Sequence, residues 1–595
     1  MPATHATGEA LELTDRDLLP LRPWRRAQED PQHPSFSHVV DGDWQTITAG
    51  EHLESLVATV RGLIATGVTA GDRVVLMADT RYEWLLLDEA IWNAGAGTVP
   101  VYPSSSRSQL EWIVRDSGAR VLLVETPAMA QLATGLDVEV LVIDDGALAT
   151  LAERGQTVAE DEVHARRDAV TFDGLAGIVY TSGTTGRPKG VVLTHRHLAA
   201  EVAGCLAHPI GEVGAPGRRI LMFLPMAHVL ARSVAYIAAQ SGATVGFWSD
   251  FSTIVEKFGS FRPHMVVGVP RVFEKVHAGI RAKAAGRRVS AAVFAKGEQV
   301  AIDWSRAVGD DPHPGSPGLR LRVLHAVFDR QLYAKVRAAL GGETMYEISG
   351  GGALGERLGH FFRGVGVPIH EGYGLTETCA AITVNGPGQQ RVGTVGRPLP
   401  GNEVRISEDG AIEVRGAVVT DGYWNNEEAT RSSIVDGWFA TGDLGSLDDE
   451  GYLTITGRAK EIIVTAGGKN VVPGPLEEEL RAHPLVAHAM IVGDGRPFVA
   501  ALVTLDHDGV RRWAADKGRG DVDPADLVDD EALRVELQQV IDEANQAVSR
   551  AEGVRRFVLL ADDFTEERGE LTATLKLRRH VIEETRGETM RELYG

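Results

Sequence analysis

The sequence has little cysteine and no excess of positive charge, and each shortage excludes a class of protein. Only two cysteines, Cys205 and Cys379, occur among 595 residues, so neither a disulfide framework nor a cysteine-rich zinc site can be built. Lys plus Arg number 60 against 82 Asp plus Glu, which gives a net charge of −22. A chain this acidic makes a poor general binder of nucleic acid. Positive charge that holds an anionic substrate must therefore be local.

The sequence also lacks a long apolar run and a targeting segment. Its first residues, MPATHATGEALELTD, contain neither a basic region nor an apolar stretch, so we predict no signal peptide. The most apolar stretch, residues 220–248, is interrupted by Pro225, His228, Arg232 and Gln240. Because a spanning helix needs ~20 mostly apolar residues, we expect a strand, a helix and a second strand there, and no transmembrane segment. Two cysteines suit a reducing, cytoplasmic location.

Strand-like and helix-like segments alternate through most of the chain. Strands are expected at 73–78 (RVVLMA), 120–125 (RVLLVE) and 139–144 (EVLVID), with helical stretches such as 106–117 between them. This alternation predicts an α/β fold with mixed or parallel sheets. Residues 283–320 have the composition of a helical insertion that ends in an exposed loop at 310–318.

The pattern changes after about residue 390, where short alternating strands predict a small β unit. An α+β region is expected beyond Gly457, with strands near 461–465, 487–493 and 557–561 and helices near 475–484 and 530–550. We therefore divide the chain into two domains. Residues 1–457 form a large domain of layered α/β sheets plus the β unit, and residues 458–595 form a smaller α+β domain.

One segment has the composition of a phosphate-binding loop. It follows an apolar run, LAGIVY, and reads Thr181, Ser182, Gly183, Thr184, Thr185, Gly186, Arg187, Pro188, Lys189, Gly190. Glycines let the backbone approach a ligand, and successive amides and hydroxyls make a nest for phosphate oxygens. It is not a Walker A loop, because Pro188 precedes the lysine and Gly190 follows it. A flexible surface turn is the alternative reading.

This segment resembles the first core motif of the adenylate-forming superfamily, which contains acyl-CoA synthetases, luciferases and peptide-synthetase adenylation domains. Further matches occur in the family's order along nearly the whole chain. They are Gly372-Tyr373-Gly374-Leu375-Thr376-Glu377, then Thr441-Gly442-Asp443, then the segment that opens with Gly457-Arg458, and last Lys576 near the C-terminus. Ala573 and Leu575 depart from the Pro and Gly that the family often has beside this lysine.

The resemblance implies an ATP site assembled from these motifs. Thr181, Ser182, Gly183, Thr184, Thr185, Gly186 and Lys189 would hold the β- and γ-phosphates. Glu377, a hard oxygen ligand, and Thr185 would hold Mg²⁺. Tyr373, with Gly372, Gly374 and Thr376, would hold the adenine, and a second glycine-rich turn with Gly351, Gly352 and Ala353 would line its pocket. Asp443 would bind the ribose hydroxyls, with Arg458 beside it.

The resemblance also implies two half-reactions. Lys576 would bridge the carboxylate of the acid and the α-phosphate of ATP during adenylate formation, with Glu377 and Thr185 as the other catalytic residues. The C-terminal domain would then turn about Lys460 and bring Gly467 and Gly468 to the incoming coenzyme A. The residues alone leave alternatives open. By residue type Lys576 is better explained as a solvated surface lysine, and its position after Leu571-Thr572 favours the catalytic role. Gly467-Gly468 is equally well explained as a hairpin turn.

The acid is expected to be a long-chain fatty acid. The segments GVPRVFEK (268–275), FDR (328–330) and GRAKEIIVTAGGKN (457–470) resemble bacterial long-chain fatty acyl-CoA synthetases. His228 could line the acyl tunnel or could be an ordinary helix histidine. The main alternative is a fatty acyl-AMP ligase that delivers to an acyl carrier protein. A luciferase-like oxygenase and a nucleotide-binding regulator are further rivals, and a loose, peripheral membrane association would suit so apolar a substrate.

Overall fold

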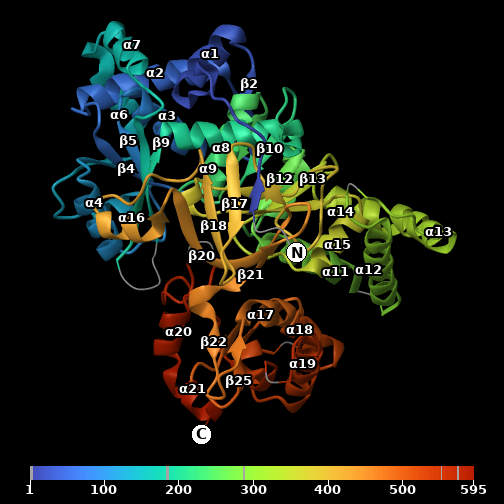
Figure 1. Ribbon diagram of the computed structural model, residues 1–595. Coiled ribbons are helices and arrows are strands. Elements are labelled where there is room, and N and C mark those ends of the chain that lie inside the picture. Colours follow the sequence, from blue (N-terminus) through green and yellow to red (C-terminus); the bar gives the residue numbers. More distant parts are fainter. Residues whose placement is uncertain are drawn as a thin grey trace. The chain divides into compact units, whose positions relative to one another are not determined.

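The computed structural model describes residues 5–181, 187–285, 288–311, 313–520, 522–550, 552–572 and 575–594, without the side chains of 282–291 and 547. The chain divides into two compact units. Unit 1 comprises Met1–Ser407, Glu413–Thr441 and Leu447–Thr454, and unit 2 comprises Glu408–Ile412, Gly442–Ser446 and Ile455–Gly595. The predicted α/β class is confirmed within unit 1, where sheets and helices are layered (Figure 1).

The first sheet of unit 1 contains the strands expected near residues 73, 120 and 139. Its order is β7 (Glu139–Val142), β6 (Val121–Val124), β4 (Arg73–Met77), β5 (Gly97–Val101), β8 (Leu175–Thr181) and β9 (Lys189–Thr194). All pairs are parallel except the antiparallel hairpin β8–β9. The connecting helices are α2 (Ala49–Ala65), α3 (Tyr82–Asn93), α4 (Arg107–Ser117), α5 (Pro127–Leu132), α6 (Ala147–Arg154) and α7 (Glu160–Asp168).

Local sequence explains where the helices begin and end. Ser106 caps α4 by accepting the Gln109 N–H while the Gln109 side chain accepts the Ser106 N–H, and Gly118 ends the helix with φ of 66°. The Thr48 and Glu51 pair caps α2 in the same way. These caps satisfy helix-end amides that have no partner within the helix.

The second sheet of unit 1 is mixed. Its order is β16 (Arg397–Pro398), β15 (Thr383–Val384), β14 (Ile369–Tyr373), β13 (Tyr346–Ser349), β12 (Met265–Gly268), β10 (Arg219–Met222), β11 (Thr244–Phe247), β2 (Pro34–Val40) and β3 (Asp43–Thr48). With α9 (Val229–Ser241) between β10 and β11, the predicted strand–helix–strand order at 220–248 is confirmed. The other helices here are α1 (Arg22–Glu29), α8 (His195–Ala207), α10 (Ile254–Phe261) and α15 (Glu356–Gly364).

A buried ion pair joins helices and strands in the core of unit 1. The guanidinium of Arg232 in α9 donates to Asp88 in α3 at 2.8 and 2.7 Å, and neither side chain is exposed. Asp88 also accepts the hydroxyls of Thr98 and Tyr236 at 2.5 and 2.7 Å. Arg232 donates to the Ala176 carbonyl at 3.3 Å, so the cluster links α3 and α9 to β5 and β8.

The helical insertion is present. It consists of α11 (Pro270–Ala285), α12 (Arg288–Val308), α13 (Leu319–Phe328), a π-helical turn (Asp329–Tyr333) and α14 (Ala334–Ala339). The predicted small β unit is present as β17 (Asn402–Ile406), β18 (Ala411–Gly416), β20 (Trp438–Leu447) and β21 (Leu453–Arg458). Strand β1 (His5–Thr7) pairs with β17, and β19 (Ile434–Val435), which follows α16 (Glu427–Ser433), pairs with β20.

Unit 2 has its own core around a three-stranded sheet. The sheet order is β24 (Val486–Val492), β25 (Val499–Leu505) and β26 (Val554–Leu560), covered by α17 (Pro473–Arg481), α18 (His507–Asp516), α19 (Glu531–Ala544), α20 (Arg579–Thr585) and α21 (Gly587–Tyr594). The strand expected at 461–465 is shorter: β22 (Ile463–Val464) pairs with β23 (Asn470–Val471). The strand starts later than expected because Ala459–Glu461 form a 3₁₀ turn before β22.

Candidate functional site

The predicted phosphate segment connects the two strands of the β8–β9 hairpin. Thr181 at the end of β8 lies opposite Lys189 at the start of β9. Ser182, Gly183, Thr184, Thr185 and Gly186 lie outside the described residues. Five residues of β8, from Ala176 to Tyr180, are buried, so the hairpin is fixed in the first sheet of unit 1. Thr181, where the segment starts, and Lys189 therefore lie at the same end of the hairpin.

Tyr423 connects the predicted phosphate lysine to the predicted magnesium ligand. The ammonium of Lys189 lies 5.3 Å from the centre of the Tyr423 ring, and the Tyr423 hydroxyl donates to Glu377 Oε1 at 2.9 Å. Burial, and then the nearby Glu377 carboxylate, raise the pKa of the Tyr423 hydroxyl. The hydroxyl therefore stays protonated and remains a donor to Glu377.

Backbone contacts fix Tyr423 in this place. Tyr423 forms a β-bridge with Val191 of β9, and on either side of it the Val192 N–H donates to the Gly422 carbonyl and the Trp424 N–H to the Gly190 carbonyl. Sequence reasoning missed Tyr423. Its only local signal is an aromatic pair, Tyr423-Trp424, in a polar stretch, and the contact with Glu377 spans 46 positions.

The segment that carries Glu377 forms a tight turn after β14. Thr378 closes it, because its hydroxyl accepts the Leu375 N–H at 2.7 Å and lies within hydrogen-bond distance of the Ala380 carbonyl at 3.0 Å. Gly374 is required there, since a Cβ atom at this position would lie 1.5 Å from the Ala380 carbonyl oxygen. The turn leaves Tyr373 and Glu377 half-buried.

The two glycine-rich segments predicted to bind adenine lie at the carboxyl ends of neighbouring strands, at the same edge of the sheet. Strands β13 and β14 are parallel, with Ser349 opposite Glu371, so the turn after β13 lies beside the Gly372-Tyr373 end of β14. Gly351, Gly352 and Ala353 are exposed, and Gly351 has φ of 78°, which favours glycine. Carboxyl ends of parallel strands are where ligands bind in open α/β sheets.

His228 begins helix α9. Its Nδ1 accepts the Leu230 N–H at 3.1 Å, so the imidazole caps the helix, and the side chain is half-buried. The geometry is that of a helix histidine. Leu230 lies close to Gly350, where an added Cβ would be 3.3 Å from Leu230 Cδ2, which places the start of α9 beside the glycine-rich turn.

The charges of three predicted residues interact within unit 2. Arg458 Nε pairs with the buried carboxylate of Asp443 at 2.9 Å. Surrounding protein atoms desolvate the Lys576 ammonium and lower its pKa, and the Arg458 charge acts in the same direction, whereas Asp443 and Glu461 oppose it. Lys576 follows a turn in which the Thr572 N–H donates to the Lys576 carbonyl and the Lys576 N–H to the Thr572 hydroxyl.

The predicted hinge and coenzyme A residues are exposed. Lys460 lies in the 3₁₀ turn after β21. Gly467 and Gly468 form a hairpin turn between β22 and β23, in which Gly468 has φ of 76° and donates to the Thr465 carbonyl. The structure thus shows the hairpin and leaves a coenzyme A contact as a prediction.

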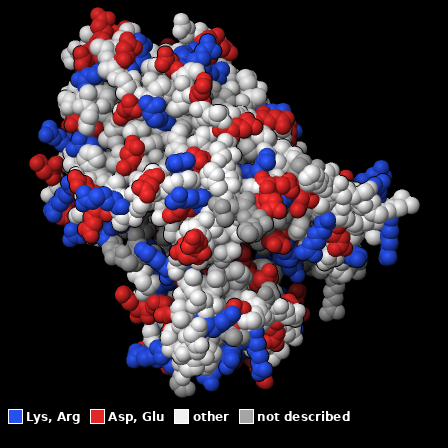
Figure 2. Space-filling model, in the orientation of Figure 1, with Lys and Arg blue, Asp and Glu red and all other residues white. Residues whose placement is uncertain are grey.

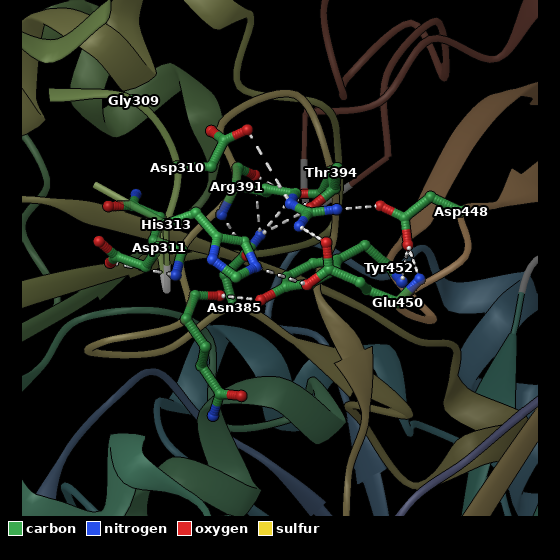
Figure 3. Close-up of polar contacts among 12 residues, drawn as sticks. Gly309, Asp310, Asp311, His313, Asn385, Arg391, Thr394, Asp448, Glu450 and Tyr452 are labelled. Carbon is green, nitrogen blue, oxygen red and sulfur yellow. Dashed lines mark hydrogen bonds and ion pairs between the residues drawn. The ribbon is translucent and has the colours of Figure 1, made fainter. Parts of the chain in front are cut away.

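Within unit 1, Arg391 holds the turn between β20 and β21 in place (Figure 3). Its guanidinium pairs with Asp448, pairs with Glu450 at 2.6 Å, and lies 4.2 Å from the centre of the Tyr452 ring. Its backbone N–H donates to Asn385 Oδ1 at 3.0 Å, in the loop that follows β15. These contacts tie the β20–β21 turn to the sheet that carries Tyr373.

A resident metal centre is not built by the described side chains. Among the described residues, no group of three or more His, Cys, Asp or Glu side chains is arranged to hold a metal ion. A magnesium ion that arrives with a nucleotide needs only one or two carboxylates, because phosphates and water supply the remaining ligands. Glu377, whose Oε1 is already oriented by Tyr423, fits that smaller requirement.

The described residues contain no membrane-spanning helix, and charges of one sign are not clustered on the face shown in Figure 2. Within the described part of the chain, no helix is both long and apolar enough to cross a bilayer. Lys and Arg side chains are interspersed with Asp and Glu side chains in Figure 2. The net charge of −22 is therefore not gathered into one patch on that face.

Comparison with known proteins decides the family. Residues 24–424 match the AMP-binding enzyme family, and residues 460–595 match the AMP-binding enzyme C-terminal domain. The chain belongs to the AMP-binding enzymes. It is 44% identical to the long-chain-fatty-acid–CoA ligase FadD15 of Mycobacterium bovis and to FadD15 of Mycobacterium tuberculosis, over 100% of this chain and 99% of each relative. This AMP-binding enzyme also shares its fold with ATP-bound MatB from Rhodopseudomonas palustris, with a TM-score of 0.69, 24% identity and coverage of 96% and 99%.

Proposed function

We propose that this AMP-binding enzyme is a long-chain fatty acid–CoA ligase. It converts ATP, a fatty acid and coenzyme A to acyl-CoA, AMP and diphosphate through an acyl-adenylate. The observation that carries the proposal is the end-to-end similarity to FadD15, over 99% of that ligase. The contact of Tyr423 with both Lys189 and Glu377 supports it, because it unites two predicted ATP-binding motifs that are distant in sequence.

The first step would take place among the residues of the predicted ATP site. Lys189 and Thr181, with Ser182, Gly183, Thr184, Thr185 and Gly186 between them, bind the β- and γ-phosphates. The adenine would be bound by the exposed turn of Gly351, Gly352 and Ala353, by the Gly372-Tyr373-Gly374 end of β14, and by Thr376. Glu377 and Thr185 would hold Mg²⁺, which would supply positive charge to neutralise the phosphates. Asp443 accepts the ribose hydroxyls next to Arg458, and Lys576 neutralises the charge between carboxylate and α-phosphate.

The second step would use the C-terminal domain, residues 458–595. Rotation about the exposed Lys460 withdraws Lys576 and presents the Gly467-Gly468 turn, whose lack of side chains leaves room for the narrow pantetheine arm. Domain rotation of this kind often limits turnover.

The acyl chain supplies most of the affinity in this scheme. Each buried methylene contributes about 0.8 kcal/mol, so roughly ten additional methylenes separate long from short acids by several powers of ten. His228, which begins α9 beside the glycine-rich turn, lies near the acyl carboxylate in the proposed complex. We place the enzyme in the cytoplasm, with peripheral contact to the inner face of the membrane from which fatty acids are drawn.

The experiment measures pyrophosphate release with ATP, Mg²⁺ and acids of increasing chain length, with and without coenzyme A. Release that is greatest with long chains, together with acyl-CoA and AMP when coenzyme A is added, supports the proposal. Pyrophosphate without acyl-CoA, and acyl transfer only to a phosphopantetheinylated carrier protein, would instead identify a fatty acyl-AMP ligase. No release with any acid would overturn the proposed reaction.

A further inference from the structure

Helix α8 carries a buried acid that reaches the turn of Glu377. The helix follows β9 without a break, since β9 ends at Thr194 and α8 begins at His195. On its buried face, Glu201 is only 2% exposed, and its Oε1 accepts the Ala381 N–H at 3.0 Å. Glu201 therefore links the strand that begins with Lys189 to the turn that carries Glu377.

The turn needs such support because its backbone is strained. Cys379 has φ of 60°, a left-handed conformation that a non-glycine residue keeps only where its surroundings hold it. Two buried side chains from neighbouring helices hold its far end. Ser233 of α9 donates to the Cys379 carbonyl at 3.1 Å, and Glu201 accepts from Ala381.

Glu201 is an unfavourable residue to bury for structural purposes alone. Its Oε2 has no hydrogen-bond partner among the described residues, and its Oε1 has the Ala381 N–H and the Cys205 thiol at 3.7 Å. Burial raises the pKa of the Glu201 carboxyl to about 8, an effect that the bonds from Ala381 and Cys205 oppose. Costly polar groups in a core commonly occur where function requires a fixed geometry.

We propose that Glu201 is a positioning residue for adenylation, which acts by fixing Ala381 and through it the carboxylate of Glu377. The inference rests on the proposed function for the role of Glu377. Loss of the Ala381 bond releases the strained end of the turn and lets Glu377 move relative to Lys189. A misplacement of about 1 Å in a catalytic site can reduce the rate ~10²-fold.

The experiment compares two substitutions at one position. Glu201→Gln keeps an oxygen that accepts the Ala381 N–H, whereas Glu201→Leu removes it at similar volume. We expect Glu201→Gln to retain kcat and KM for Mg²⁺-ATP within about twofold and Glu201→Leu to lose on the order of 10–100-fold in kcat/KM, with a higher Mg²⁺ requirement. Rescue by glutamine distinguishes positioning through the backbone bond from loss of packing.

Two further variants keep the comparison interpretable. Leu63→Ala, in the buried face of α2, is a control that lowers stability without touching the turn. Ser233→Ala removes the other side-chain bond to the turn and serves if Glu201→Leu does not fold. We expect Ser233→Ala to raise the Mg²⁺ requirement, and Leu63→Ala to leave it unchanged at a temperature where it is folded.

Mg²⁺-ATP affinity, measured by titration calorimetry without an acid, separates this inference from the proposed reaction. Wild-type protein that releases no pyrophosphate but binds Mg²⁺-ATP more tightly than Glu201→Leu would overturn the reaction and retain the inference. Folded Glu201→Leu or Ser233→Ala protein with wild-type kcat, KM and Mg²⁺ dependence would overturn the inference.

Discussion

Replacing Asp88 by asparagine should destabilise unit 1 more than any surface charge change. The Asp88 carboxylate accepts four hydrogen bonds, two of them from Arg232, and both side chains are fully buried. A neutral amide at this position cannot balance the guanidinium, which is left buried and unpaired. Breaking one side of such a pair costs about 3–5 kcal/mol. A loss of ~4 kcal/mol changes the folding equilibrium of unit 1 nearly a thousandfold.

Urea unfolding followed by tryptophan fluorescence measures this loss. Trp84 and Trp92 are suitable probes, because the Arg232 guanidinium lies 5.9 and 5.0 Å from their rings. The two units can unfold in separate transitions, and nine of the ten tryptophans, all except Trp513, lie in unit 1, so the larger fluorescence transition is the one to compare.

The matched control for the Asp88 variant is a charge removed at the surface. Glu403 pairs with Arg415 at 2.8 Å, but the two side chains are 25% and 46% exposed. Glu403→Gln should therefore cost about 0–1 kcal/mol. Asp88→Asn with a loss below about 1 kcal/mol, equal to that of Glu403→Gln, would refute the argument that the buried guanidinium requires its partner.

Three other predictions follow from the site. Tyr423→Phe should leave folding within ~1.5 kcal/mol of wild type but raise the Mg²⁺ concentration needed for pyrophosphate release, since Glu377 loses its donor; an unchanged Mg²⁺ curve would contradict this. Lys576→Ala should reduce adenylate formation ~10²–10³-fold yet spare thioester formation from preformed acyl-adenylate, and equal loss of both half-reactions in quenched-flow assays would count against the two-step roles. Because the pKa of Glu201 is raised to about 8, its contribution to stability is complete below the unfolded pKa near ~4.5 and is lost as pH rises toward 8. Relative to Glu201→Gln, wild-type stability should thus fall by up to ~1.4 kcal/mol per pH unit in that window, and parallel pH–stability curves would disprove it.

The strands of the first sheet could be predicted because each is a short apolar run, which is buried in β4 and β6 and half-buried in β7. The runs at 73–78, 120–125 and 139–144 form β4, β6 and β7, and the helical stretch predicted at 106–117 forms α4. The strand predicted at 461–465 was too long, because the 3₁₀ turn of Ala459–Glu461 precedes β22. Local propensity does not specify where such a turn begins.

Several features could not be predicted because they depend on contacts between distant residues. Tyr423 meets Glu377 across 46 positions, and Glu201 meets Ala381 across 180. Neither residue belongs to a motif that marks it, and a glutamate at a helical position is normally expected on the solvent face. By contrast, the resemblance implied that Tyr373 and Gly351 lie at one pocket, and the parallel pairing of β13 and β14 places the ends of these strands side by side.

The β-bridge between Tyr423 and Val191 affects the design of chimeras between related enzymes. Residues 420–424 are bonded to β9 by a β-bridge, by backbone bonds at Gly190 and Val192, and by the Thr420 hydroxyl. Residues 420–424 and the β8–β9 hairpin therefore form one structural block, which has to be exchanged as a whole. A chimera that grafts residues 175–194 alone would separate the block, whereas one that also carries residues 420–424 would transfer it whole.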